Sequence, residues 1–171
     1  MRWAALVMMG SLGGCMTNGA DVSSGDVARA ELRDAGGRIV ARAEAQQVEG
    51  GVRVGIEASN VSPGTHGVHA HAVGRCDAPG FESAGPHWNP GGRQHGRENP
   101  QGPHLGDLPN LIVASDGRGR LDFTISGAAL RGPGGVLDGD GAALVIHASP
   151  DDDRTDPSGN SGARIACGLL G

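Results

Sequence analysis

All seven histidines of this chain lie between residues 66 and 147, and six of them stand in spacings that suit metal ligands. His69 and His71 form a His-x-His pair inside the apolar stretch 67–73. His147 ends a second apolar run, residues 143–146, where a strand would deliver a side chain to the edge of a site. This pattern constrains the chain more than any other feature, because its fold has to bring these positions together.

The remaining candidate ligands lie in the segment 86–109, which Gly and Pro interrupt too often for a helix or a strand. His87, His95 and His104 are followed there by Asp107. A loop of this length is unusual in a compact domain, and a bound metal is one of the few things that can order it. Three imidazoles and one carboxylate suit tetrahedral zinc, which accepts nitrogen and oxygen ligands.

The rest of the sequence predicts one all-β domain. The chain has 32 glycines, no tyrosine and only 2% aromatic residues, which disfavours a helical core of large side chains. Small and branched residues with glycine at the turns suit a compact β-sandwich. Short alternating or apolar stretches, separated by turn signals such as Asp116-Gly117, predict eight strands. These strands are expected at residues 27–32, 38–45, 51–58, 67–73, 111–115, 120–125, 142–148 and 164–167.

Six motifs carry a family resemblance, in the same order from about residue 27 to the C-terminus. They are His66-Gly67-Val68-His69-Ala70-His71, Ser83-Ala84-Gly85-Pro86-His87-Trp88-Asn89-Pro90, His95-Gly96, His104-Leu105-Gly106-Asp107-Leu108-Pro109-Asn110, Val145-Ile146-His147 and Gly162-Ala163-Arg164-Ile165-Ala166-Cys167-Gly168. This set resembles the copper/zinc superoxide dismutases. The resemblance implies an eight-stranded Greek-key β-sandwich or barrel with long metal-binding and active-site loops. It also implies an oxidoreductase that converts superoxide to O2 and hydrogen peroxide as copper cycles between Cu(II) and Cu(I).

The resemblance further implies one copper ion and one zinc ion per subunit, and a role for each ligand. The copper ligands would be His69, His71, His87 and His147, and the zinc ligands would be His87, His95, His104 and Asp107. His87 would bridge the metals and carry a proton, while zinc tunes its basicity. Asp151 would link His69 to His95, and His66 would be a structural residue outside the metal set.

Two further roles follow from the same resemblance. Arg164 would be the active-site arginine, whose guanidinium stays charged and offers planar donors to an anion. Cys76 and Cys167 would form the intrasubunit disulfide, which fits an exported chain. Two unrelated buried thiols are the competing interpretation.

The charge balance raises a question about the substrate, because superoxide is an anion and the chain carries a net charge of −5. This family is a known example of electrostatic steering, which depends on the local field. Arg154 is the only basic residue between His147 and Arg164, in an acidic stretch, so the steering is expected to be weak or to come from Arg75, Arg93 or Arg97. No basic stripe or motif suggests nucleic-acid binding.

The N-terminus resembles a bacterial lipoprotein signal. Residues 1–14 would be the signal peptide, with Cys15 the lipidated residue, and residues 15–26 a flexible tether before the domain at 27–171. The alternative is an ordinary cleaved signal peptide with Cys15 incidental. In either case the chain is exported; the lipidated form would face the periplasm from the outer membrane, and the lipid anchor would be its only membrane contact.

Two functions of different class remain after this reading. One is a superoxide dismutase, an antioxidant enzyme of the cell envelope. The other is a copper- or zinc-binding lipoprotein that buffers or delivers metal with little turnover. The joint presence of Arg164, the bridging His87 and the Cys76–Cys167 pair favours the enzyme. The sequence leaves a monomer and a homodimer open.

Overall fold

The structure is a computed structural model that describes residues 26–171. The predicted signal peptide at 1–14, the predicted lipidation site Cys15 and nearly all of the predicted tether at 15–26 lie outside the described residues. Within residues 26–171, no helix is long and apolar enough to cross a membrane.

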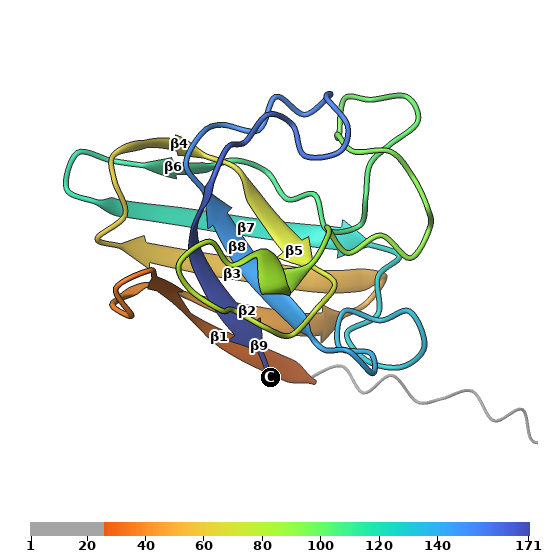
Figure 1. The fold of residues 1–171 in the computed structure, drawn as a ribbon. Helices are drawn as coiled ribbons and strands as arrows, with labels where there is room; N and C mark the ends of the chain where they lie inside the picture. Colours follow the sequence, from red (N-terminus) through yellow and green to blue (C-terminus); the bar gives the residue numbers. More distant parts are fainter. Residues whose placement is uncertain (1–25) are drawn as a thin grey trace, which may run out of the picture.

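The described chain forms one antiparallel sheet of nine strands that curls into a nearly closed barrel (Figure 1). The strand order is β4-β6-β7-β3-β2-β1-β9-β8-β5, so the non-consecutive neighbours β4–β6, β3–β7, β1–β9 and β5–β8 mark the crossovers. The only helical element in this part of the chain is the short 3-10 helix η1, Glu82–Ala84. The strands are β1 Val27–Asp34, β2 Ile39–Val48, β3 Gly51–Ser59, β4 Gly64–His66, β5 Val68–His71, β6 Leu111–Val113, β7 Arg118–Ser126, β8 Ala142–His147 and β9 Arg164–Leu170.

All eight predicted strands are present, and the all-β prediction is confirmed. The ninth strand, β4, lies outside the predicted set, because the pair Pro63-Gly64 is typical of a turn, whereas Gly64 begins β4. β4 pairs with β6, but β5 pairs with β8, and Gly67 separates them. A Cβ at Gly67 would lie 2.9 Å from the Ser161 Cβ, so only glycine lets the chain change partners at this point.

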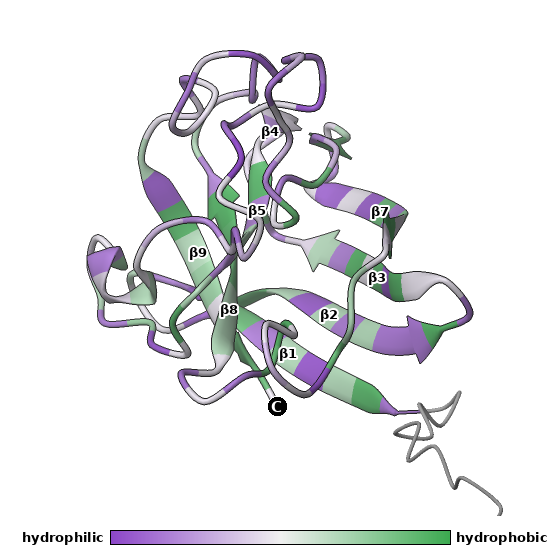
Figure 2. Cartoon of the chain, turned by 90° about the vertical axis from the view of Figure 1, so that its right-hand side faces the viewer, coloured by the Kyte–Doolittle hydropathy of each residue, from purple (hydrophilic) through white to green (hydrophobic). Residues whose placement is uncertain are grey.

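The core uses small and branched side chains that alternate with polar ones along the strands, as the hydropathy stripes of β1, β2 and β7 show (Figure 2). β8 is the exception, because all six of its residues are buried. Leu144 and Ile146 face the main core, whereas Ala143 and Val145 pack in a second cluster with Phe81, beneath the loop that the Cys76–Cys167 disulfide ties to β9. Both faces of β8 are therefore covered along the strand, which ends at His147.

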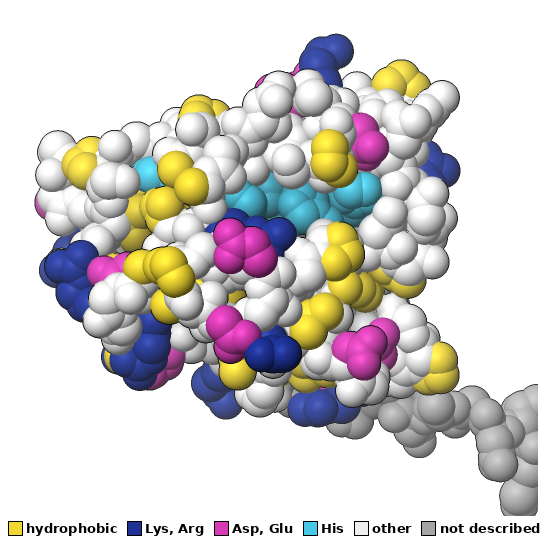
Figure 3. All heavy atoms as spheres, in the orientation of Figure 1, with side chains coloured by type: hydrophobic (Ala, Val, Ile, Leu, Met, Phe, Trp, Pro, Cys, Tyr) yellow, Lys and Arg dark blue, Asp and Glu magenta, His cyan; other side chains and the backbone are white. Residues whose placement is uncertain are grey.

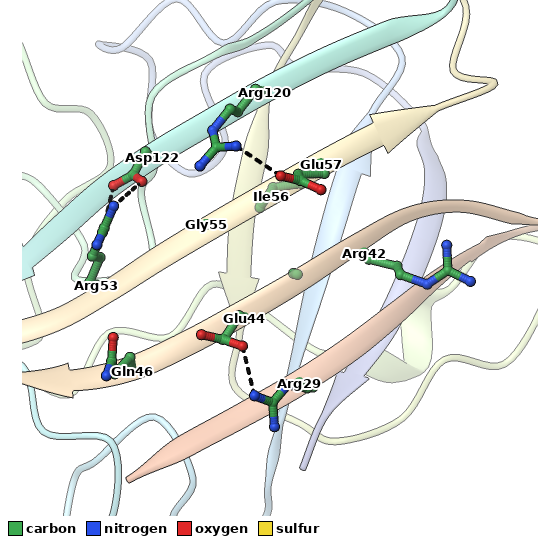
Figure 4. A pocket seen from close by; sticks show the side chains of 11 residues that line it. Arg29, Arg42, Glu44, Gln46, Arg53, Gly55, Ile56, Glu57, Arg120 and Asp122 are labelled. Carbon is green, nitrogen blue, oxygen red and sulfur yellow. Dashed lines mark hydrogen bonds and ion pairs between the residues drawn. The ribbon is translucent and has the colours of Figure 1, made fainter. Parts of the chain in front are cut away.

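The outer face of β1, β2, β3 and β7 has a shallow hollow over Gly55, crossed by ion pairs between neighbouring strands (Figure 4). Arg29 pairs with Glu44 at 2.9 Å and Arg120 with Glu57 at 2.8 Å. These charges are exposed and satisfied by each other, so the hollow offers no unpaired donor set for chemistry.

Candidate metal centre

Strands β5 and β8 bring three of the predicted ligands together at one end of the barrel. His69 and His71 lie two residues apart on β5 and therefore share a face of the sheet. β5 pairs with β8, which ends at His147 after a register shift between Ile146 and His147. His87 joins them because its backbone forms an isolated antiparallel β-bridge with His71. One donor atom from each of these four buried histidines lies within 4.8 Å of the others. These four histidines are the first donor group.

Three of these rings each hold one nitrogen in a hydrogen bond and leave the other without a partner. His69 Nε2 lies 2.6 Å from an Asp151 carboxylate oxygen. His71 Nδ1 donates to the backbone oxygen of Gly85 at 2.9 Å, and His147 Nδ1 to that of Gly162 at 3.1 Å. Among residues 26–171, the buried atoms His69 Nδ1, His71 Nε2 and His147 Nε2 have no hydrogen-bond partner. Since unpaired buried polar atoms are costly, three such lone pairs in one place fit a metal ion.

Burial also keeps these rings in the form that binds metal. It lowers the pKa of His69 to about 3, that of His71 to about 2 and that of His147 to about 4. Near neutral pH each ring is therefore uncharged and keeps a lone pair on its free nitrogen.

The second group of donors surrounds one oxygen of Asp107. This Oδ1 atom lies 3.0 Å from His87 Nδ1, 3.0 Å from His95 Nδ1 and 3.3 Å from His104 Nδ1. In a tetrahedral zinc site with bonds near 2.0 Å, neighbouring ligand atoms lie about 3.3 Å apart. The other oxygen, Oδ2, accepts the backbone N–H groups of Gly96 and His104, each at 2.9 Å. The long loop is thus wound around a single carboxylate whose orientation is fixed.

His69 also comes close to this second group. One donor each from His69, His87, His95 and Asp107 lies within 4.8 Å of the others. His104 is nevertheless the better fourth member, because its Nδ1 is 3.4 Å from His87 Nδ1 and close to Asp107, while His69 already engages Asp151. The free Nδ1 of His69 belongs with the orphaned nitrogens of the first group.

Asp151 connects the two groups of donors. Its carboxylate lies 2.6 Å from His69 Nε2 and 3.0 Å from His95 Nε2. Burial raises the pKa of this carboxyl, but the hydrogen bonds from both rings outweigh burial and hold the pKa well below its usual range. Burial lowers the pKa of His95, yet Asp107 and Asp151 together raise it to about 9. The pair of carboxylates thus favours a positive charge at this end of the site.

Arg164 lies beside the first donor group, where the loop after Cys76 fixes its position. Its Nη1 donates to the backbone oxygen of Phe81 at 2.7 Å and its Nη2 to that of Gly85 at 2.8 Å. Burial lowers the pKa of the guanidinium, and Glu82 opposes that shift. The disulfide between Cys76 and Cys167 joins this loop to β9, which carries Arg164. The predicted disulfide is confirmed.

A cavity of about 830 Å³ opens between the loops at this end of the barrel. Figure 3 shows histidine side chains at the floor of this hollow, with charged side chains near its rim. Its lining includes His87, His104, His147, Arg93, Arg164, Asp138 and Asp156. A small solute can therefore reach both donor groups and Arg164 from solvent.

The other predicted residues lie where their contacts explain them. His66 is buried, with Nδ1 2.7 Å from the backbone oxygen of His147 and Nε2 2.8 Å from that of Ser62, so it ties β4 to the end of β8. Arg75 and Arg97 are not part of the cavity lining and pair with Asp77 and Asp153. Of the three proposed steering arginines, Arg93 alone lines the cavity.

Sequence reasoning missed the groups that hold these residues in place. Asn110 exchanges two hydrogen bonds with the backbone of Asp151, at 2.8 and 2.9 Å. Asn110 is the last residue of the motif at 104–110, and that position is the signal that could have identified it. The carbonyls of Phe81 and Gly85 have no such signal, because a backbone oxygen is not visible in a residue pattern.

Known proteins resemble this chain over almost its whole length. The family model for copper/zinc superoxide dismutase (SODC) matches residues 35–170. Superoxide dismutase [Cu-Zn] from Deinococcus radiodurans is 39% identical over 182 residues, covering 99% of this chain and 97% of that protein. Superoxide dismutase [Cu-Zn] 2 from Aquifex aeolicus is 37% identical over 173 residues, covering 99% of each.

Solved structures agree with these relatives. The crystal structure of a SOD-like protein from Bacillus subtilis superposes with a TM-score of 0.79 at 41% identity, covering 83% of this chain and 97% of that one. The clock protein EA4 has a TM-score of 0.72 at 32% identity, covering 87% of this chain and 96% of its own. Since the family model spans far more than half of the sequence, this chain belongs to the copper/zinc superoxide dismutase family.

Proposed function

We propose that this protein is a superoxide dismutase, which converts two superoxide anions and two protons into O2 and hydrogen peroxide. The observation that carries this proposal is the set of three orphaned, buried imidazole nitrogens on His69, His71 and His147. One of these rings, that of His147, lines a cavity that is also lined by a fixed arginine, Arg164. A site of this kind combines metal donors with an anion-binding group.

The ligand assignment follows the two donor groups. Copper would be held by His69 Nδ1, His71 Nε2, His147 Nε2 and a ring nitrogen of His87, and zinc by the Nδ1 atoms of His87, His95 and His104 with Asp107 Oδ1. We infer one ion of each kind per subunit. His87 belongs to both groups of close donors, which supports its role as the bridge.

Copper supplies one-electron chemistry at this site when bound, whereas zinc has a single oxidation state and serves structure and electrostatics. The protein has to bring a small anion to the site and provide protons. The guanidinium of Arg164 is anchored by two backbone carbonyls and would bind the anion in the cavity. The ring of His87 lines the cavity, where one of its nitrogens can carry a proton to the reduced substrate.

A metal-buffering protein would need the donors alone. The anchoring of Arg164 in the cavity by Phe81 and Gly85 has no purpose in storage, and it favours the enzyme. The test is a stopped-flow measurement of superoxide decay with purified protein loaded with copper and zinc. The chelator EDTA is present to suppress catalysis by free copper, and under these conditions we expect a second-order rate far above that of the same copper concentration without protein. A rate no higher than that of chelated copper alone would overturn the proposal.

We further propose that the domain at residues 27–171 is exported and anchored through a lipidated Cys15 to the outer membrane. The Cys76–Cys167 disulfide supports an oxidising compartment. Intact-mass measurement of protein purified from membranes tests the anchor: acyl chains on a chain that starts at Cys15 are expected. A soluble product cleaved elsewhere would favour the ordinary signal peptide.

A further inference from the structure

The positive charges of this acidic protein are distributed unevenly between surface and cavity. All 14 basic residues are arginine, and thirteen of them lie in the described residues. Eleven of these thirteen form an ion pair with an aspartate or glutamate. They are Arg29, Arg33, Arg38, Arg42, Arg53, Arg75, Arg97, Arg118, Arg120, Arg131 and Arg154.

Of the arginines within residues 26–171, only Arg93 and Arg164 have no ion-pair partner. Both line the cavity of about 830 Å³ beside the two donor groups, which we call the metal cavity. A paired guanidinium presents little net field to an approaching anion, whereas an unpaired one presents its full charge. The net charge of −5 therefore conceals two unneutralised cations beside the proposed site.

The arginines of the neighbouring loops are not available for this role. Arg97 pairs with Asp153 at 2.9 Å, and Arg154 pairs with Glu98 at 2.5 Å. These two pairs cross between the segment 93–104 and the segment after His147 and hold the two loops together. Neither Arg97 nor Arg154 is part of the cavity lining.

Arg93, by contrast, is held at a defined place with hydrogen-bonding capacity to spare. Its backbone N–H donates to Asn89 Oδ1 at 3.0 Å, and its backbone oxygen accepts Asn89 Nδ2 at 2.8 Å. Its Nη2 donates to the backbone oxygen of Gly102 at 2.7 Å. A guanidinium has five N–H donors, so this contact orients the group without exhausting it.

We propose that Arg93 is the second anion-guiding residue of the metal cavity. Superoxide is then drawn in from the side of the loop that carries His87 and His95, and not by the loop that follows His147. This inference rests on the proposed dismutase function. Asp138 and Asp156 line the same cavity and oppose the two arginines, so the rate of capture depends on a local balance of charges.

The test compares Arg93→Gln with Arg118→Gln, a matched control that also removes one positive charge, from an exposed pair outside the cavity. For metal-loaded protein, kcat/KM for superoxide is measured by stopped flow across a range of ionic strength. At low ionic strength we expect Arg93→Gln to lower kcat/KM by roughly two- to fivefold and to flatten its salt dependence, with rates converging at high salt. Arg118→Gln should match the parent protein, and Asp138→Asn should raise the rate at low salt.

A second readout needs no turnover. Inorganic phosphate is titrated into copper-free, zinc-loaded protein, and the Nε–H signals of Arg93 and Arg164 are followed by NMR. Phosphate should shift both signals, and Arg93→Gln should weaken its affinity by roughly threefold. Equal rates and equal phosphate affinity for Arg93→Gln and Arg118→Gln would overturn the role of Arg93. Absence of dismutase activity in the parent protein, with phosphate still bound at Arg93, would instead refute the proposed reaction.

Discussion

His71 and Arg164 donate hydrogen bonds to the same atom, the backbone oxygen of Gly85, at 2.9 and 2.8 Å. A ring of the first donor group and the cavity arginine are therefore positioned by one peptide group. Gly85 has a φ of 73°, and a Cβ there would lie 2.9 Å from Val73 Cγ2. Glycine lets this carbonyl reach both partners without strain.

Replacing Arg164 should separate anion binding from metal binding. In Arg164→Ala we expect kcat/KM for superoxide to fall by about tenfold or more and inhibition by azide to weaken, because the fixed positive charge is lost. Copper content should stay unchanged, since His71 keeps its own bond to Gly85. Stopped-flow kinetics and metal analysis on the same sample check this. A variant with parent kinetics at low ionic strength would contradict the role given to Arg164.

Phe81 holds the second carbonyl that anchors Arg164, in an unusual backbone conformation. It has a φ of 59° and a ψ of 22°, and the other non-glycine residues with positive φ among residues 26–171 are Asn60, Asp153 and Asn160. Asn and Asp tolerate this region, whereas a bulky aromatic rarely occupies it. Phe81 is only 2% exposed and belongs to the same buried cluster as Val145 and Cys167, so the second core cluster holds the backbone in place.

We predict that Phe81→Gly removes the apolar side chain that holds residue 81 in place, although it relieves the strain of the positive φ. The free energy of unfolding should fall by about 2–4 kcal/mol, and azide should bind less tightly because the residue 81 carbonyl no longer fixes Arg164. Phe81→Leu, which retains an apolar anchor, should recover most of the azide affinity at similar metal content. Denaturation curves and azide titrations separate the two effects. Unchanged azide affinity in the glycine variant would show that the ring has no positioning role.

The fold and the donor set were largely predictable from the sequence, for identifiable physical reasons. Strands such as β2 and β3 alternate buried and exposed residues, and that period is readable without a structure. His87, His95, His104 and Asp107 lie in a long Gly- and Pro-rich segment, and a shared metal centre is one of the few things that can order such a loop. The short strand β4 was not predictable, because its three residues follow Pro63 directly, end before Gly67 and are too few to carry a period.

The electrostatics could not be predicted, because ion pairs depend on which strands and loops become neighbours. Arg97 and Arg93 are similar in sequence terms, yet Arg97 meets Asp153, which is 56 residues away in the chain. The guanidinium of Arg93, among residues 26–171, donates only to a backbone oxygen of its own loop. Whether an arginine stays unpaired therefore depends on how the loops fold and not on the local sequence.

Removing His147 should discriminate between the two donor groups. His147 contributes an orphaned nitrogen to the first group and none to the cluster around Asp107. We therefore expect His147→Ala to abolish dismutase activity and lower copper affinity while zinc content persists. Metal analysis after dialysis against both ions measures this. Equal loss of copper and zinc would place the boundary between the groups elsewhere.

Gly159 lies against the carboxylate that joins the two donor groups. A Cβ at this position would lie 1.8 Å from Asp151 Oδ1 and 2.7 Å from His95 Nε2, so Gly159→Ala must displace that carboxylate. Because hydrogen-bonded partners of metal ligands are typically worth about 10- to 100-fold in affinity, we expect zinc affinity to fall by that order. The backbone at Gly159 is left-handed, with a φ of 62°, which alone penalises alanine.

Gly127→Ala is the control for that backbone penalty, since Gly127 has a φ of 74° and no atom within 4 Å of an added Cβ. Both variants should lose about 1 kcal/mol of stability from the backbone, but only Gly159→Ala should lose zinc. Competition titration with a zinc chelator measures the difference. Combining Gly159→Ala with Asp151→Ala should weaken zinc binding little beyond Asp151→Ala alone, because both changes remove the same bridge between His69 and His95. Additive losses would mean that Gly159 acts on the site by a route other than the Asp151 carboxylate.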